Sequence, residues 1–454
     1  MKTKFLLVLA VALASVLGAS AKVIRISEAE QAKEFFALNG GDTLVLAEGV
    51  WDDLNIKFKS IDGTRAIPVV FRGETAGKTI LRGLSSLSFS GYGIVVEDLW
   101  FQDPITAKAN AAVIQFRTSD AVNAYESVIR NVRMTGFNTD FHIEDQSQWL
   151  AIYGMRNIVE NCSFEDKVWL GCTVAVFPET GHPSQPNHTI RNNYFTRPRA
   201  YYNENGDKIN SQEVLRTSTY IYSMTDTRCL IENNMFEKCS GEIEYISIKS
   251  CNNTFRGNVF LECEGTLTLR HGNGNVIVDN YFDGRNVPGT GGIRIIGDKH
   301  IVSGNYMKNL AGSSLKGKEA DEDLGYYSAI SIMMGVNESV LNAYYQPKDI
   351  IIEKNVAINC YQGMAVGIVN RTNQNQPFYG SRVSDNVFIS TDIAAKVFNS
   401  PSPEKTIWQN NVFEGGKFID TTPQALGAVS RTAELEAREM PVFDFGPEWK
   451  YMYE

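Results

Sequence analysis

The sequence has little that would suit a membrane protein or a nucleic-acid-binding protein. After the first 21 residues, no apolar run approaches the roughly 18 residues that a membrane-spanning helix needs. Lys and Arg number 43 against 52 Asp and Glu, so the formal net charge is −9. An acidic chain argues against non-specific binding to nucleic acid, and it repels anions at long range. Any anionic ligand therefore needs local positive charge in order to bind.

Cysteine and helical periodicity are also scarce. The 454 residues contain 7 Cys, which cannot all pair and do not make a dense disulfide framework. No apolar stripe with a 3.6-residue period persists over the length of a helix. No stretch is rich enough in Pro, Gly or Ser to mark a linker between domains. We therefore expect one all-β domain over residues 22–454, with capping segments at its ends.

Residues 1–21 have the pattern of a secretory signal peptide. Lys2 and Lys4 precede the apolar run FLLVLAVALASVLG, and Ala19-Ser20-Ala21 resembles an A-x-A cleavage site. The apolar run is too short to span a bilayer, although an uncleaved anchor is the alternative. The pattern predicts removal of residues 1–21 and export to a bacterial periplasm or beyond.

A short phrase recurs along the chain. It consists of an aliphatic residue, two or three polar residues, Asn, and then an apolar or aromatic pair, as in IRNNYF, IENNMF and IVDNYF. The Asn of the phrase is found at Asn131, Asn161, Asn193, Asn234, Asn258, Asn280, Asn305, Asn355, Asn386 and Asn411, and Asp98 takes this place in VVEDLWF.

The spacing of the phrase predicts the fold. The shortest intervals between successive Asn are 22 to 25 residues, and insertions account for longer ones of up to 50. Such a period, built from short strands rich in Val, Ile and Phe, is typical of a solenoid whose coils bury their apolar faces by stacking. A leucine-rich repeat would show Leu at fixed offsets, and a propeller would repeat at about 40 residues or more. We predict a right-handed parallel β-helix, with the repeat Asn in left-handed turns and their side chains hydrogen-bonded from coil to coil.

The ends of the predicted solenoid differ from its middle. ISEAEQAKEFFAL, residues 26–38, reads as a short amphipathic helix that would cap the N-terminal end, and GGDTLVLAEGVW reads as the first coil. Pro401 to Pro403 and the tail from Thr432 onward break the pattern, so we expect them either to cap the far end or to pack along the side. Cys239, Cys263 and Cys360 each follow a repeat Asn by five residues. We expect them to stack in the core, with a disulfide between Cys239 and Cys263 as the alternative.

The segment GEIEYISIKS, residues 241–250, carries three charges in a strand-like stretch. Alternate side chains of a strand point to opposite faces, so an inward Ile243 would turn Glu242 and Glu244 outward. Further along, an inward Ile246 and Ile248 would turn Lys249 outward, which requires a bulge or corner near Tyr245. The same alternation turns Arg270 outward after Leu267 and Leu269, and Arg294 outward between Ile293 and Ile295. The preceding coil, INSQEVLRTS, offers Asn210, Glu213 and Arg216.

One face of neighbouring coils would therefore collect groups that suit a metal ion and an anion. Two carboxylates and an amide oxygen suit Ca²⁺, which takes oxygen ligands, and arginines suit carboxylates of a substrate. The alternative is a solvated strand face with surface ion pairs, and the pattern alone does not choose between the two. The predicted set is Asn210, Glu242, Glu244, Lys249, Arg270, His271 and Arg294.

The run GEIEYISIKS, followed by LRHGN and preceded by INSQEVLRTS, resembles polysaccharide lyase family six. That family comprises alginate lyases and the dermatan-sulfate-cleaving chondroitinase B type, on right-handed parallel β-helices. The resemblance covers most of the chain in architecture and its central third in motifs. It implies Ca²⁺ ligands at Asn210, Glu242 and Glu244, a Brønsted base at Lys249 and a Brønsted acid at Arg270. It also implies substrate contacts at His271 and Arg294, with which we group Arg216. Ser211 departs from the family pattern N-G-x-E-x-I-R, which has Gly there.

This resemblance implies cleavage of an acidic polysaccharide by Ca²⁺-assisted β-elimination. We also expect a monomer, and the acidic net charge predicts no nucleic-acid partner. Alginate is favoured over dermatan sulfate because no Arg-Arg pair is available for a sulfate-rich ligand. A lysine base requires a lowered pKa, and we expect Ca²⁺ and Arg270 to lower that of Lys249. The alternatives are a chondroitinase B-type enzyme, a pectate-lyase-like enzyme, a hydrolase with paired Asp, and a non-catalytic β-helix adhesin or binding module.

Overall fold

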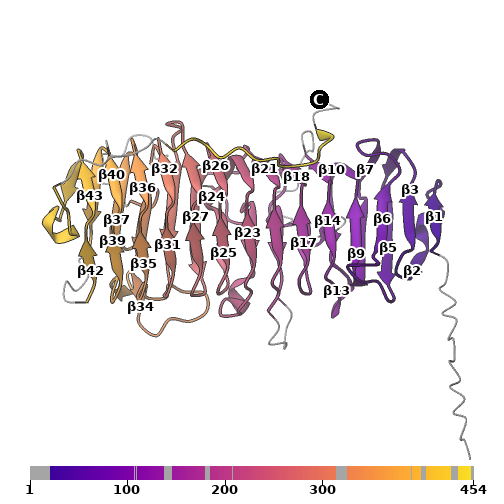
Figure 1. Ribbon diagram of the computed structural model, residues 1–454, viewed down its shortest axis with the longest axis horizontal. Coiled ribbons are helices and arrows are strands. Elements are labelled where there is room, and N and C mark those ends of the chain that lie inside the picture. The colour runs from indigo at the N-terminus through magenta and orange to yellow at the C-terminus, as the bar shows by residue number, and fades with distance from the viewer. Residues whose placement is uncertain are drawn as a thin grey trace, which may run out of the picture.

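The computed structural model describes residues 21–106, 108, 110–136, 146–178, 185–206, 208–312, 325–389, 391–399, 405–430 and 438–450. They form one elongated solenoid of short strands stacked along a single axis (Figure 1). The predicted all-β parallel β-helix is confirmed. The predicted signal peptide, apart from Ala21, and Pro401 to Pro403 lie outside these residues. No helix of the described chain is long and apolar enough to cross a membrane.

From the second coil on, each coil contributes one strand to each of three parallel sheets, which we name A, B and C. Sheet A consists of β1 (Val23–Ile26), β3 (Thr43–Leu46), β6 (Val69–Gly73), β9 (Ile94–Glu97), β14 (Val128–Arg130), β17 (Ile158–Glu160), β20 (Thr189–Arg191), β23 (Leu230–Glu232), β25 (Thr254–Arg256), β28 (Val276–Val278), β31 (Ile301–Ser303), β35 (Ile351–Glu353), β39 (Arg382–Ser384) and β42 (Ile407–Gln409).

The other two sheets share one long strand, β24 (Met235–Lys249), whose first half lies in sheet C and whose second half lies in sheet B. Sheet C also contains β4 (Gly49–Asp52), β7 (Thr79–Gly83), β10 (Trp100–Pro104), β15 (Arg133–Thr135), β18 (Ser163–Glu165), β21 (Tyr194–Arg197), β26 (Val259–Leu261), β29 (Tyr281–Asp283), β32 (Tyr306–Lys308), β36 (Val356–Ile358), β40 (Val387–Ile389) and β43 (Val412–Glu414). Sheet B also contains β2 (Phe35–Leu38), β5 (Asn55–Ser60), β8 (Ser86–Tyr92), β11 (Ala112–Gln115), β16 (Gln148–Ile152), β19 (Val174–Val176), β22 (Leu215–Thr217), β27 (Glu264–His271), β30 (Thr290–Ile295), β33 (Ile330–Met333), β37 (Gln362–Ile368), β41 (Ile393–Val397) and β44 (Lys417–Ile419).

Two short antiparallel pairs are added to this arrangement. β12 (Arg117–Ser119) pairs with β13 (Val122–Tyr125), which also pairs in parallel with β8 of sheet B, and β34 (Gly335–Val336) with β38 (Gln374–Gln376) forms a separate two-stranded sheet. The core between the sheets is mainly apolar, because alternate residues of the regular strands point inward. A column of phenylalanines runs through it, with successive ring centroids 4.5 to 5.1 Å apart. Its members are Phe164, Phe195, Phe236, Phe260 and Phe282.

The repeat Asn residues form a ladder of hydrogen bonds along one corner of the coils. In each step the side-chain amide of one Asn donates to the Oδ1 of the next, for example Asn234 to Asn258 at 2.9 Å and Asn258 to Asn280 at 3.0 Å. The ladder runs through Asn193, Asn234, Asn258, Asn280, Asn305, Asn355, Asn386 and Asn411. The predicted coil-to-coil bonding is therefore confirmed.

The prediction that the repeat Asn adopt left-handed turns is wrong for these eight residues. The left-handed residue is the one before, such as Asn233 (φ 53°) before Asn234 and Asp279 (φ 55°) before Asn280. In the earlier coils Asp98, Asn131 and Asn161 are themselves left-handed. The residues that follow them take the ladder position, as Cys162 does when its N–H donates to Asn193 Oδ1 at 2.9 Å.

The N-terminal segment also differs from the prediction. Residues 26–38 form only the 3₁₀ turn η1 (Gln31–Lys33), followed by strand β2. Phe36 and Leu38 point into the core and β2 pairs with β5, so sheet pairing outweighs the local helical pattern. All seven Cys are buried and free, as the core-stacking interpretation expects, and the alternative disulfide is absent. Two further 3₁₀ turns are η2 (Tyr220–Tyr222) and η4 (Gln424–Leu426).

Residues 438–450, which we call the strap, return along the outer face of sheet C (Figure 1). At its start the Arg438 guanidinium donates to Gly304 O at 3.0 Å. At its end the ring of Trp449 packs against that of Trp100, with the ring centroids 6.2 Å apart. In between, Phe443 and Phe445 pack on an outward apolar cluster formed by Met235, Val259, Leu261, Tyr281 and Tyr306. Of the two alternatives for the tail, these residues follow the second and pack along the side.

Candidate active site

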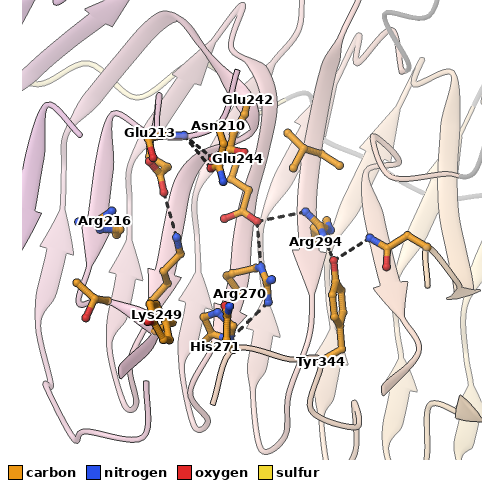
Figure 2. Close-up of a pocket in the computed structure, with 16 residues that line it drawn as sticks. Asn210, Glu213, Arg216, Glu242, Glu244, Lys249, Arg270, His271, Arg294 and Tyr344 are labelled. Carbon is orange, nitrogen blue, oxygen red and sulfur yellow. Dashed lines mark hydrogen bonds and ion pairs between the residues drawn. The ribbon is translucent and has the colours of Figure 1, made fainter. Parts of the chain in front are cut away.

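A pocket of about 490 Å³ opens over sheet B in the middle of the solenoid (Figure 2). Strands β22, β24, β27 and β30 supply its floor, and three irregular segments, around residues 210, 342–344 and 370, supply its walls. All eight predicted site residues line it: Asn210, Arg216, Glu242, Glu244, Lys249, Arg270, His271 and Arg294. The structure therefore brings the predicted set together.

The strand register explains why arginines face this pocket. Arg216 pairs with Ser247, Ser247 with Thr268, and Thr268 with Arg294, so these outward positions lie in one row across four coils. Their inward neighbours, including Ile246, Leu267 and Ile293, are fully buried in the core. With coils about 4.8 Å apart, Arg216 and Arg294 are separated by roughly 14 Å along the axis.

Ile243 does not point into the core, as the alternation predicted, but lines the pocket. Strand β24 is irregular here: Ser240 pairs with Glu264 and Glu244 with Thr266, so three residues of β24 oppose one of β27. Tyr245, between Glu244 and Ile246, is a further extra residue and fills the core instead. The predicted irregularity near Tyr245 exists, and it lets Glu242 and Glu244 face the pocket together.

Three glutamates, Glu213, Glu242 and Glu244, line the pocket. Burial raises the pKa of Glu242 to about 8, and the charges of Glu213 and Glu244 add to the effect. Burial would also raise the pKa of Glu213, but Lys249 and Arg216 outweigh it and hold that pKa at about 2. No ion pair of Glu242 occurs within the part of the chain that the structure describes. Its Oε1 accepts the backbone N–H of Ser211 at 3.3 Å.

The same Ser211 N–H also donates to Asn210 Oδ1 at 2.7 Å. This shared donor holds an amide oxygen beside the carboxylate of Glu242 (Figure 2). Among the described residues, no three His, Cys, Asp or Glu side chains converge as a metal site would require. The predicted ligand set differs from such a cluster because it combines two carboxylates with one amide.

The cationic side of the pocket centres on Lys249. Its Nζ lies 3.1 Å from Glu213 Oε1, and both side chains are largely withdrawn from solvent. Burial disfavours the charged ammonium, but Glu213 and Glu244 outweigh burial, and the Lys249 pKa lies above its ordinary value. The sequence analysis expected a lowered pKa for Lys249. The protein's own residues instead raise this pKa. Burial, with Arg270 and Lys249 nearby, lowers the pKa of His271 to about 2, so this imidazole is neutral.

Glu244 is shared by two arginines. Its Oε1 lies 3.5 Å from Arg270 Nε and 3.4 Å from Arg294 Nη1, and its other oxygen accepts the Ser247 hydroxyl. Although Arg294 faces away from the core, its side chain is only 2% exposed. One carboxylate therefore balances two guanidinium groups at the centre of the pocket.

The pocket-lining residues that sequence reasoning missed include Tyr344 and Asn370, and it assigned no role to Glu213. The Tyr344 hydroxyl accepts hydrogen bonds from Arg294 at 3.2 Å and from Asn370 at 2.8 Å. Tyr344 comes from the insertion that makes the interval between Asn305 and Asn355 unusually long. That long interval was the available signal, because an insertion next to the charged coils can reach over their outer face.

A model of the family described as Chondroitinase B matches residues 26–432. The chain belongs to the chondroitinase B family. A solved alginate lyase of polysaccharide lyase family 6, AlyGC, is 30% identical with a TM-score of 0.78, and the match covers 90% of this chain and 53% of that one. This chain thus spans about half the length of that relative.

A second solved relative covers the chain more evenly. It is a mannuronic acid-specific family 6 lyase from human gut microbiota, 25% identical with a TM-score of 0.73, and the match covers 91% of this chain and 92% of that one. None of the curated proteins matches the sequence. The resemblance to polysaccharide lyase family six is confirmed.

Proposed function

We propose that this member of the chondroitinase B family cleaves alginate, a 4-linked polyuronate, by Ca²⁺-assisted β-elimination. One observation carries the proposal: a lysine, three arginines and paired carboxylates converge in one pocket on the outer face of sheet B. No Asp lines that pocket in the described part of the chain, so the hydrolytic alternative lacks its acid pair. An adhesin would need neither a buried Lys–Glu pair nor a neutral imidazole beside it.

The metal proposal is supported by the donor set. Asn210, Glu242 and Glu244 would hold the ion through oxygen atoms, which Ca²⁺ prefers. Glu242 is buried beside two other carboxylates and forms no ion pair with any described residue, so a bound cation would relieve that repulsion. When bound, Ca²⁺ would neutralise the substrate carboxylate and so acidify the adjacent C5 proton.

Lys249 would accept the C5 proton while in its neutral form. The resulting ammonium would then be held by Glu213 at the distance seen in the present pair, 3.1 Å. The C4–O bond breaks as the C4=C5 double bond forms. Arg270 holds its proton firmly, so its positive charge would stabilise the departing O4 while Lys249 or water returns the proton. His271, Arg216 and Arg294 would contact the substrate.

Alginate is favoured as the substrate because no two arginines are adjacent in the sequence, so no Arg-Arg pair would serve sulfate groups. The names of the two relatives support this choice. A dermatan sulfate lyase is the second candidate, since the family model bears that enzyme's name. Residues 1–21 would direct export to the periplasm or beyond, where such polymers are met.

Ultraviolet absorbance during incubation with alginate, dermatan sulfate and pectate tests the proposal. Elimination creates an absorbing unsaturated uronate, whereas hydrolysis creates reducing ends without absorbance. We expect absorbance with alginate and none for Lys249→Ala, which should retain the fold. Growth of absorbance only with dermatan sulfate would select the second candidate. Reducing ends without absorbance would refute elimination altogether.

A further inference from the structure

The hydroxyl of Tyr344 faces Arg294 at one side of the pocket (Figure 2). It accepts from Arg294 at 3.2 Å and from Asn370 at 2.8 Å, which occupies its acceptor capacity. No acceptor for its own hydrogen is found in the described ranges, although the residue is only 3% exposed. Arg294 Nε is likewise buried without a partner. Two donors are therefore withdrawn from water and unsatisfied beside the pocket.

Positive charge is in excess around the same tyrosine. The guanidinium of Arg270 lies 4.7 Å from the Tyr344 ring centroid and that of Arg371 lies 5.4 Å from it. Arg294 donates to its hydroxyl, so three guanidinium groups surround one side chain. Glu244 pairs with two of them, and Arg371 forms no ion pair with any residue that the structure describes. An anion is the ligand that this arrangement lacks.

The wall that carries these groups is fixed in advance. Gln374 accepts the backbone N–H groups of Asn370 and Arg371 at 2.7 and 2.9 Å, and it donates to Met334 O at 2.6 Å. Strands β34 and β38 pair the two segments of the wall. The ring of Tyr344 is packed in a small apolar cluster with Ile296, Met333, Val336, Ala365 and Ile368. The Tyr344 hydroxyl and the Asn370 amide, held this way, lose little entropy when a ligand binds, whereas the Arg371 side chain is exposed.

The position also suits a neighbour of the reacting sugar. Lys249 and Arg294 stand on β24 and β30, two coils apart, which is roughly 10 Å along the axis. Adjacent sugar rings of one chain can bridge that distance. A carboxylate recurs on every residue of a polyuronate, so a substrate held at Lys249 would present a second anion near Tyr344.

We propose that Tyr344, Arg294, Asn370 and Arg371 form a second anion subsite, which binds the carboxylate of a uronate next to the one that loses its C5 proton. This inference rests on the proposed function. The subsite would make cleavage depend on two neighbouring carboxylates, and it would reject chains in which charged and neutral sugars alternate.

Short alginate oligosaccharides in which one carboxylate at a time is reduced to the alcohol test the subsite. For the wild type we expect kcat/KM to fall about 10- to 100-fold when the neighbour's carboxylate is reduced, the range for a hydrogen bond to a charged group. In Arg371→Gln and Tyr344→Phe, kcat/KM on the intact substrate should fall by a similar factor. Reducing the neighbour's carboxylate should then lower kcat/KM of these variants little further, because the effects of coupled groups are not additive. Arg382→Gln, which removes a surface partner of Glu353 on sheet A, is the matched control and should behave as wild type.

If reduction of the neighbour's carboxylate lowered kcat/KM by the same factor in the wild type and in both wall variants, the proposed subsite would be refuted. Calorimetric binding to Lys249→Ala separates this outcome from failure of the proposed function. If no polyuronate is cleaved but the intact oligosaccharide binds more tightly than the reduced one, and Arg371→Gln abolishes the difference, the subsite stands without the reaction. Equal binding of the two oligosaccharides would refute it.

Discussion

Replacing Asn234 by Ala should destabilise the solenoid strongly, because this side chain makes four buried hydrogen bonds. Its Nδ2 donates to Asn258 Oδ1 and to Ile190 O, both at 2.9 Å. Its Oδ1 accepts the backbone N–H and the side-chain amide of Asn193, both at 3.0 Å. Asn233, the preceding residue, is exposed and left-handed, with φ 53°. The two adjacent asparagines therefore offer a matched comparison.

The expected magnitudes differ several-fold. Asn234→Ala leaves two donors of Asn193 and the carbonyl of Ile190 buried without partners. At about 1–3 kcal/mol for each orphaned group, with partial relaxation, the free energy of unfolding should fall by roughly 3–6 kcal/mol. Asn233→Ala removes no ladder bond and only places Ala in a left-handed conformation, which should lower the free energy of unfolding by about 1–2 kcal/mol. Asn233→Gly should be close to neutral, since Gly adopts this conformation without strain.

Urea denaturation followed by circular dichroism would measure the three changes, and hydrogen exchange would locate them. The Asn193 amide should lose protection in Asn234→Ala and keep it in Asn233→Ala, because only the first variant removes its acceptor. If the two alanine variants lowered the urea midpoint equally, or if the Asn193 amide stayed protected in both, the ladder would not stabilise the coils as argued.

Three further predictions concern the pocket and the buried histidines. Chelation with EDTA should abolish elimination and added Ca²⁺ should restore it; full activity after exhaustive chelation would remove the metal from the proposal. Lys249→Ala should cut kcat by roughly 10²–10⁴-fold with a smaller effect on binding, and Lys249→Arg should not restore kcat because guanidinium stays charged. Steady-state kinetics on alginate would measure both variants. Near-wild-type turnover of the Ala variant would refute the assignment of Lys249 as the base. Burial lowers the pKa of His188 to about 3 and that of His300 to about 4. Below about pH 6.5 these histidines therefore bind protons in the unfolded chain but stay neutral in the folded chain. The urea concentration at the unfolding midpoint should decrease as the pH is lowered from about 6.5 to about 4. His300→Asn, which can keep an acceptor for the Asn275 N–H, should flatten that fall, and an unchanged slope would contradict the assignment.

Sequence alternation located most of the site because strand periodicity is local. Once Ile248 and Leu269 are placed inward, Lys249 and Arg270 must face out, and the structure agrees. Ile243 failed because a strand pairing with three residues against one breaks the alternation, and nothing in GEIEY reveals how many residues the bulge contains. The partner strand decides that number.

The ladder and the wall show two other limits. Side-chain stacking was predictable from the spacing of Asn, but the residue that takes the left-handed turn was not, since IENNMF offers two adjacent candidates. Tyr344 could not be assigned because an insertion of irregular structure carries no period from which to read its direction. The Lys249 pKa depends on Glu213, whose distance in space no sequence spacing provides.

The strap has a consequence for the order in which the molecule is completed. Residues 438–450 are synthesised after every coil that they cross, and the bond from Arg133 to Lys450 O joins residues 317 apart in the chain. Contacts of such separation close late, because the chain entropy must be lost before they form. Until then, the apolar stripe of Met235, Val259 and Leu261 on sheet C is uncovered in an otherwise finished solenoid. A newly made chain thus exposes an apolar surface that a chaperone or a second chain can bind. Docking of the strap buries this surface.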